Sequence, residues 1–151
     1  MTLTPKETSL LTDLKSQEQL CVEKYQKYSC EACSPELKCL FSEIATAEKE
    51  HLNTVTQMLS GTVPQVKPLQ GQNNNCCKKV AYADQRSMDI DKFLLSDMLA
   101  MEKHVSSSYD TAVFEFTNPD ARKMLNHIQA EEQQHGEKLW AYMSANGFYN
   151  G

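Results

Sequence analysis

The chain repeats itself at an offset of 84 residues. When residues 10–59 are laid on residues 94–143 without gaps, ten pairs are identical. They include Pro35 and Pro119, each of which stands just after a polar residue that can cap a helix. An internal match of this kind indicates two copies of one supersecondary unit that bury a shared core. The chain is therefore expected to fold as two equivalent halves.

Helix start signals divide each half into two helices. Thr4, Pro5 and Glu7 form the pattern of a capping box with proline at the first helical position. Asp89 or Asp91 is expected near the start of the third helix. Further start and stop signals are Ser34-Pro35, Asn118-Pro119, Gly61 and Gly147. Together these signals predict helices over residues 5–32, 35–60, 89–116 and 119–145.

The stretch between the second and third helices, residues 61–88, is too long for an ordinary hairpin turn. Gly, Pro and Asn dominate its first two-thirds, which indicates a loop. A long crossover connection in a four-helix bundle would explain a loop of this length. The sequence thus predicts an all-α single domain over residues 1–151, with a hairpin at 5–60 joined by the crossover to a hairpin at 89–145.

Carboxylates and imidazoles interrupt the apolar faces of all four predicted helices. In the first and third helices the interrupting residues are Glu18 and Glu102. In the second and fourth helices the interruption is a Glu-x-x-His motif, formed by Glu48 with His51 and by Glu132 with His135. Residues at i and i+3 share one face of a helix. In each half, the single Glu lies 16 residues before the turn between the two helices, and the Glu-x-x-His motif begins 14 residues after it. All four helices are therefore expected to present these groups at the same level along the bundle.

Four carboxylates in one core must be protonated, paired with cations or bound to metal, because a buried unpaired charge costs several kcal/mol at least. Lys49, Lys103 and Lys138 are close in sequence but fall off the apolar faces. Two divalent cations would balance four carboxylates, and two histidines would supply neutral ligands. Oxygen and imidazole ligands without thiolate favour iron or manganese, and zinc is an alternative. The pattern is that of a bundle with a dinuclear metal site.

Less specific interpretations stay open. A lone Glu-x-x-His on a helix is usually a solvated surface pair, and a duplicated fold can keep a degenerate or empty site. Tyr25 and Tyr109 lie two turns beyond Glu18 and Glu102. They are either ordinary core aromatics or candidate catalytic residues that tune the metals through hydrogen bonds to the carboxylates. His127 has no counterpart in the first half and is expected at the surface.

Charge and hydropathy exclude several classes. The net charge of −5 argues against a nucleic-acid binder with a basic surface. No stretch approaches the roughly 18 apolar residues of a membrane span, and the N-terminal residues lack the pattern of a signal peptide. Synthesis in the cytoplasm is therefore expected.

The six interrupting residues resemble the ligand set of the ferritin-like superfamily, which includes rubrerythrin, bacterioferritin and manganese catalase. The resemblance covers both predicted hairpins. It implies that Glu48 and Glu132 bridge two metals, while the remaining ligands, Glu18, His51, Glu102 and His135, are terminal. It also implies reactions with peroxide, oxygen or Fe(II). No paired Cys-x-x-Cys module follows the bundle, unlike in a complete rubrerythrin.

A closer resemblance is to the Coat F family of spore coat proteins. Residues 94–150 carry its features: the Asn118-Pro119 turn, the Glu-x-x-His helix and an aromatic "GFY" near the end. This resemblance implies a role in the spore coat with other coat proteins as partners, and a homodimer is one possible assembly. The rival hypothesis is a non-catalytic coat protein in which the bundle is only a packing unit.

Five of the six cysteines are expected near one end of the bundle: Cys30, Cys33, Cys39, Cys76 and Cys77. Three interpretations remain: an irregular zinc site, disulfide cross-linking within a coat, and reduced thiols.

Overall fold

Four helices account for most of residues 1–71 and 78–149, the parts of the chain that the structure, a computed structural model, describes. No strand occurs in these residues. The helices are α1 (Pro5–Glu31), α2 (Pro35–Leu59), α3 (Gln85–Glu115) and α4 (Pro119–Ala145). The predicted all-α four-helix bundle is therefore confirmed.

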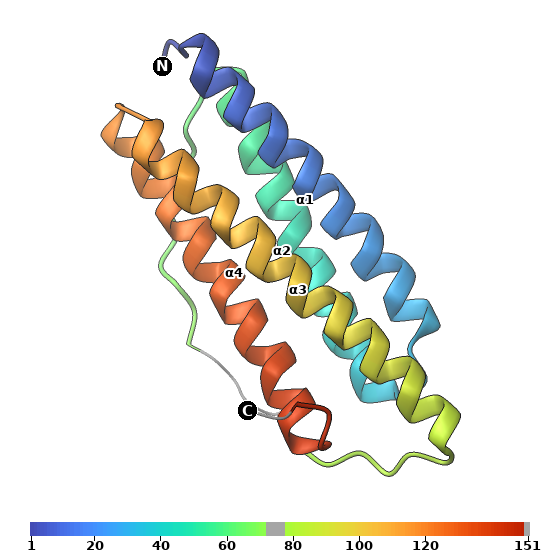
Figure 1. Cartoon of the computed structure of the whole chain (residues 1–151). Helices are drawn as coiled ribbons and strands as arrows, with labels where there is room; N and C mark the ends of the chain where they lie inside the picture. Colours follow the sequence, from blue (N-terminus) through green and yellow to red (C-terminus); the bar gives the residue numbers. More distant parts are fainter. Residues whose placement is uncertain (72–77, 150–151) are drawn as a thin grey trace.

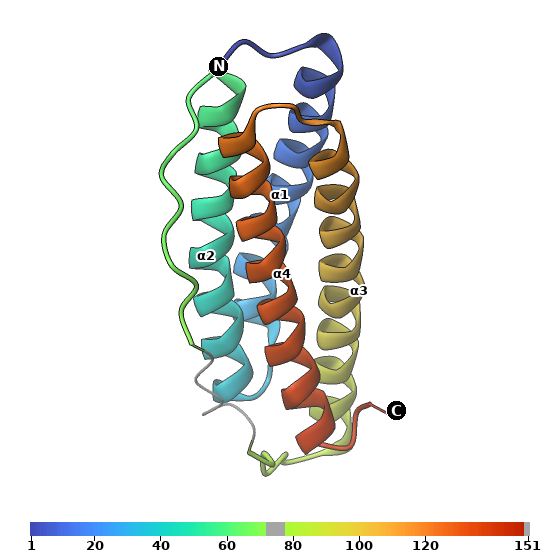
Figure 2. The ribbon, with the colours of Figure 1, turned by 90° about the vertical axis from the view of Figure 1, so that its left-hand side faces the viewer.

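The helices form two antiparallel hairpins, α1 with α2 and α3 with α4 (Figure 1). The first part of the connection between them, up to residue 71, runs beside α2 (Figure 2). Helix α3 consequently starts at the end of the bundle that carries the α1–α2 turn, where Asp91 accepts a hydrogen bond from the backbone of Cys33 (2.7 Å). Helices α2 and α3 thus run in the same direction, as the predicted crossover connection requires.

Polar side chains cap each helix at its start. Thr4 and Glu7 form the predicted capping box of α1. Ser34 and Asn118 accept hydrogen bonds from the first turns of α2 and α4. Helix α3 begins at Gln85, four residues before the predicted start.

The early start of α3 has a structural reason. Asp84 is the N-cap of α3 and accepts a hydrogen bond from Ser87 N (2.7 Å). Asp91, an expected start residue, instead accepts hydrogen bonds from the backbone N–H groups of Cys33 (2.7 Å) and Ser34 (3.0 Å). Its carboxylate therefore caps α2, a neighbouring helix, and not the helix on which it lies.

Glu7 makes the corresponding contact at the opposite end. Its Oε1 accepts a hydrogen bond from Thr117 N, next to the start of α4 (3.4 Å). Glu7 and Asp91 are related by the 84-residue offset, as are Thr117 and Cys33. The first helix of each half therefore caps the second helix of the other half.

Apolar side chains from all four helices fill the space between them. The largest that are fully buried include Tyr25, Phe41, Tyr109 and Tyr142. Among the described residues, no helix is long and apolar enough to cross a membrane. Halfway along the bundle this apolar core is interrupted by one layer of buried polar residues.

Candidate metal centre

The buried polar layer is made by the six residues that interrupt the apolar faces in the sequence. Helices α1 and α3 contribute one carboxylate each, and α2 and α4 contribute one Glu-x-x-His motif each. All six are at most 5% exposed: Glu18, Glu48, His51, Glu102, Glu132 and His135. The structure thus brings together every residue that the sequence predicts as a metal ligand.

The six residues form two overlapping groups whose ligand atoms lie within 4.8 Å of one another. One group consists of Glu18, Glu48, His51 and Glu132, and the other of Glu48, Glu102, Glu132 and His135. Glu48 and Glu132 belong to both groups, which is the place that a bridging ligand would take. Either group could hold a metal ion.

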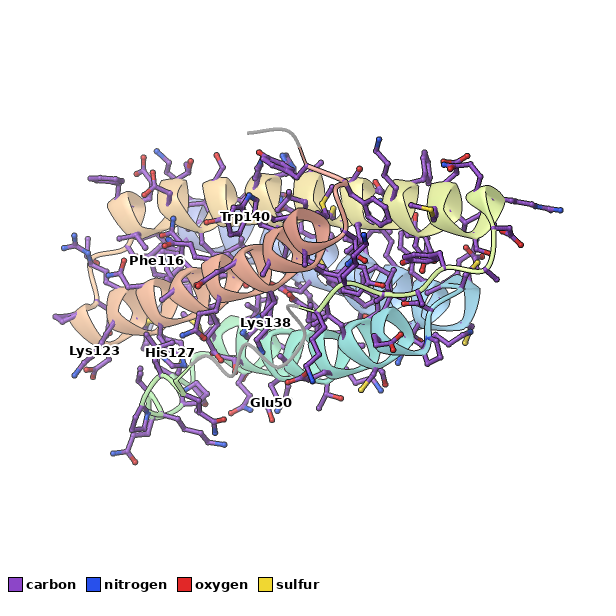
Figure 3. The ribbon with its side chains drawn as sticks, turned by 90° about the horizontal axis from the view of Figure 1, so that it is seen from below. Glu50, Phe116, Lys123, His127, Lys138 and Trp140 are labelled. Carbon is purple, nitrogen blue, oxygen red and sulfur yellow. The ribbon has the colours of Figure 1, made fainter. Side chains whose placement is uncertain are left out.

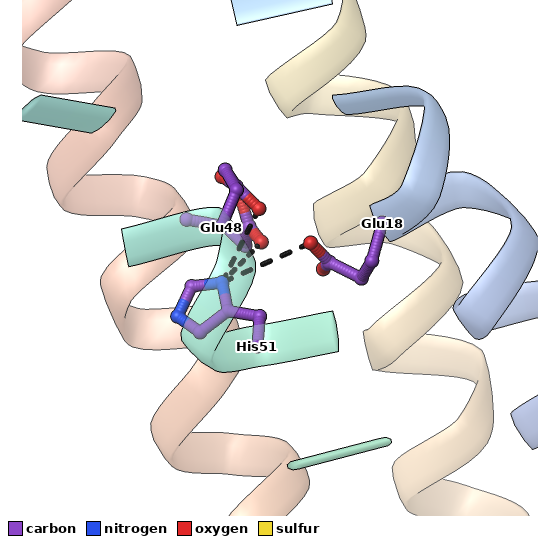
Figure 4. A group of neighbouring side chains, drawn as sticks. Glu18, Glu48 and His51 are labelled. Atoms are coloured by element: carbon purple, nitrogen blue, oxygen red, sulfur yellow. Dashed lines mark hydrogen bonds and ion pairs between the residues drawn. The ribbon is translucent and has the colours of Figure 1, made fainter. Parts of the chain in front are cut away.

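Both imidazoles turn Nδ1 toward the middle of the layer. His51 Nδ1 lies 2.9 Å from Glu132, 3.3 Å from Glu48 and 3.9 Å from Glu18, and Figure 4 shows its contacts with Glu48 and Glu18. His135 Nδ1 lies 2.8 Å from Glu48 Oε1 and 3.5 Å from both Glu102 and Glu132. The shortest contact of each imidazole is therefore with the motif of the other half.

Several carboxylate oxygens of this layer lack a hydrogen-bond donor. Oε2 of Glu18, Glu102 and Glu132 is buried and makes no hydrogen bond to the described residues. Native proteins leave few buried polar atoms in this state, so each such atom calls for a partner. Carboxylate oxygens and imidazole nitrogens in one buried layer have the donor chemistry of an iron or manganese site. The residues present therefore fit a metal.

Burial and mutual repulsion set the charges of the carboxylates. Burial raises the pKa of Glu18 and Glu132, and the neighbouring charge of Glu48 raises both further. Burial also opposes ionisation of Glu48, but interactions with Glu18 and His135 outweigh it and hold the pKa of Glu48 well below its usual range. Glu48 is thus the most acidic of these three carboxyl groups.

The imidazoles balance part of this negative charge. Burial alone would lower the pKa of His51, but contacts with Glu131 and Glu132 raise it well above its usual value. For His135, burial is likewise outweighed by contacts with Glu102 and Glu48, which raise its pKa to about 10. These contacts favour the protonated form of both imidazoles, and Nδ1 must be free of its proton to act as a metal ligand.

Tyr25 and Tyr109 connect the two halves next to this layer. Tyr25, on α1, donates a hydrogen bond to Glu102 Oε1 on α3 (2.6 Å). Tyr109, on α3, donates one to Glu18 Oε1 on α1 (2.7 Å). Both tyrosines therefore make the hydrogen bonds to carboxylates that were one of the two interpretations of the sequence. Each bond joins one half of the chain to the other. A catalytic role of the two tyrosines stays a prediction.

Glu131 and His127 belong to the site, although the sequence did not single them out. Glu131 Oε1 lies 3.3 Å from Nε2 of His51 and 2.9 Å from Nε2 of His127. The expectation that His127 is a surface residue is therefore wrong, since its side chain is only 13% exposed. A signal was available: Glu131 and His127 are an i, i+4 pair with no equivalent in the first half.

A groove between α2 and α4 leads to the two imidazoles. It has a volume of about 690 Å³, and six residues of the connection, from Pro64 to Gly71, line it together with both helices. Glu50 of α2 and His127 and Lys138 of α4 lie along it (Figure 3). His51 and His135 form part of its lining. The groove is large enough to hold small molecules and ions beside the two imidazoles.

Cys21 lies one turn from Glu18 on α1 and is buried, whereas the cysteines near the α1–α2 turn lie at the surface. Cys30, Cys33 and Cys39 are exposed free thiols. Within the described ranges they do not form a group that could hold a metal. Cys76 and Cys77 lie outside the described residues, so the cross-linking hypothesis stays a prediction.

Residues 90–150 match the family model of the Coat F domain. This part of the chain therefore carries a Coat F domain, which confirms the resemblance seen in the sequence over residues 94–150. No curated protein and no solved structure matches the chain.

Proposed function

We propose that the chain is a spore coat protein that binds two iron or manganese ions in the buried polar layer. The observation that carries the proposal is the pair of overlapping ligand groups that share Glu48 and Glu132. Glu18 and His51 would complete one position, and Glu102 and His135 the other. Two ions at these positions would bring four carboxylates close to charge balance.

When bound, such a metal pair supplies redox chemistry toward peroxide, oxygen or Fe(II). The protein residues contribute placement and exclusion of water. Tyr25 and Tyr109 hold one oxygen of Glu102 and Glu18 and leave the second oxygen of each free for a ligand role. The α2–α4 groove gives a small oxidant its route to the imidazoles.

The site also supports the proposal that residues 1–151 work as one domain. Each ligand group takes residues from the hairpin at 5–60 and from the hairpin at 89–145. A centre of this kind cannot be completed by one hairpin of the chain alone.

Metal content is the decisive measurement. Untagged protein would be compared with the Glu48→Gln/Glu132→Gln variant by elemental mass spectrometry after purification and after loading with Fe(II) or Mn(II). The expected result is about two ions per chain in the native protein and a loss of most of this metal in the variant. The Glu50→Gln/Glu137→Gln variant is the matched control, because it removes two exposed carboxylates from the same helices. Native protein that stays metal-free after loading contradicts the proposal.

The Coat F domain favours a second function, a structural coat component without turnover. Peroxide consumption and Fe(II) oxidation by the loaded protein separate the two. A loaded protein that consumes neither peroxide nor Fe(II) favours the structural role.

A further inference from the structure

Glu131 contacts the outer nitrogen of His51. The imidazole has Nδ1 toward Glu132 (2.9 Å), inside the polar layer, and Nε2 toward Glu131 (3.3 Å) on the groove side. His127 Nε2 lies 2.9 Å from the same oxygen of Glu131. These three side chains form a row from the polar layer into the groove.

The other imidazole of the layer, His135, has no such row. At the 84-residue offset, Glu131 corresponds to Ala47 and His127 to Glu43. Glu43 pairs instead with Lys138 (3.5 Å). All the hydrogen bonds and ion pairs of His135 with the described residues are made through Nδ1. The two halves therefore match in their inner ligands and differ in what holds the imidazoles from outside.

We infer that Glu131 is a positioning residue for His51 and that it makes the two metal positions unequal, with tighter binding at the position completed by His51. This inference rests on the proposed metal-binding function. A carboxylate that accepts the Nε2–H of an imidazole fixes the ring and its tautomer, so that the lone pair of Nδ1 points at the metal. It also makes the imidazole a stronger donor to the metal.

Loss of such an outer partner typically weakens metal binding by about 10- to 100-fold. The effect of Glu131 should be confined to one position, because its carboxylate contacts His51 and His127. A residue with a merely structural role would instead weaken both positions together. The two roles are therefore distinguished by measuring the affinity of each metal-binding step separately.

The experiment is a titration of the metal-free full chain with Mn²⁺ alone, in which free Mn²⁺ is counted by electron paramagnetic resonance. The native protein should show two steps that differ in affinity by about 10-fold or more. Glu131→Ala should weaken the tighter step by about 10- to 100-fold and leave the weaker step unchanged. Glu131→Asp, which keeps the carboxylate, should restore part of the loss.

Two further variants sharpen the test. Glu50→Gln removes an exposed carboxylate that lines the same groove and should change neither step. Ala47→Glu places a carboxylate at the equivalent position of the first half and should strengthen the weaker step. Thermal unfolding of each metal-free variant shows whether it is folded.

Two equal steps in the native protein overturn the inference and leave the proposed function standing. The same holds if Glu131→Ala weakens both steps equally, or if Glu50→Gln has the effect of Glu131→Ala. Native protein that binds no Mn²⁺ and no Fe(II) overturns the proposed function as well, so the two failures are distinguishable.

Discussion

The two hairpins are alike where they meet and different where they do not. At their contact they exchange equivalent interactions: Tyr25 reaches Glu102 and Tyr109 reaches Glu18. Along the groove, Glu131 of the second hairpin corresponds to Ala47 of the first at the 84-residue offset. Each buried carboxylate in a shared layer constrains the residue opposite it, since an unpaired one is costly. A position at the edge of the groove is under no such constraint.

The Coat F match covers only part of the candidate site. The Coat F match covers residues 90–150, and thus the second hairpin. Half of the buried ligand candidates, Glu18, Glu48 and His51, lie outside the match. The Coat F segment therefore supplies only half of the candidate ligands, and the first hairpin contributes the other half.

Removal of either imidazole should produce the largest effect on stability. In the metal-free protein, His51→Leu and His135→Leu each take away a cation that buried carboxylates contact at 2.8–2.9 Å. Loss of one partner of a buried ion pair costs about 3–5 kcal/mol. Urea unfolding without metal measures this cost, and the equivalent roles of the halves predict similar losses for the two variants. A loss below about 1 kcal/mol for either one would show that its imidazole is uncharged in the layer.

The two reciprocal caps should differ by a smaller amount. Asp91 is fully buried and accepts hydrogen bonds of 2.7 and 3.0 Å from the start of α2. Its equivalent Glu7 makes one longer bond, 3.4 Å, to Thr117 N. Asp91→Ala should lower the free energy of unfolding by about 2–3 kcal/mol, because it leaves buried N–H groups without acceptors, and Glu7→Ala by about 1 kcal/mol.

Urea unfolding at neutral pH compares the two variants directly. Glu36→Ala, at an exposed position in the first turn of α2, is a suitable control for loss of a carboxylate near a helix start. Equal losses for Asp91→Ala and Glu7→Ala would mean that the longer bond of Glu7 is compensated by its role in the capping box of α1.

The sequence was sufficient for the helices and for the inner ligands. Proline after a capping residue marks three of the helix starts, and polar residues on apolar faces identify the six buried groups. The start of α3 was misplaced because Asp84, Asp89 and Asp91 are equivalent as start signals, and only the fold assigns Asp91 to another helix. Glu131 was missed because an i, i+4 pair with a histidine looks like a solvated surface pair until α2 packs beside it.

Asp97 and its equivalent Asp13 should give the smallest difference. Asp13 is exposed, whereas Asp97 accepts hydrogen bonds from Lys24 (3.0 Å) and Tyr28 (2.6 Å) and so joins α3 to α1. Burial raises the pKa of Asp97, but these two hydrogen bonds outweigh it and lower the pKa overall. A lowered pKa in the folded state contributes stability that is full above the unfolded pKa of about 3.9 and is lost as pH falls through the folded value.

Asp97→Asn should therefore lower the free energy of unfolding at pH 7 by less than about 1 kcal/mol, because the pair is partly solvated. Asp13→Asn should cost nothing measurable, since this exposed side chain makes no hydrogen bond or ion pair with the described residues and its charge is screened by solvent. Urea unfolding at pH 7 and at successively lower pH values measures both. The gap between the two variants should close in acid, where Asp97 is protonated in the native protein too. If the two variants still differ in free energy of unfolding in acid, the shape of the side chain at position 97 causes the difference. The charge of Asp97 would then not distinguish the two halves.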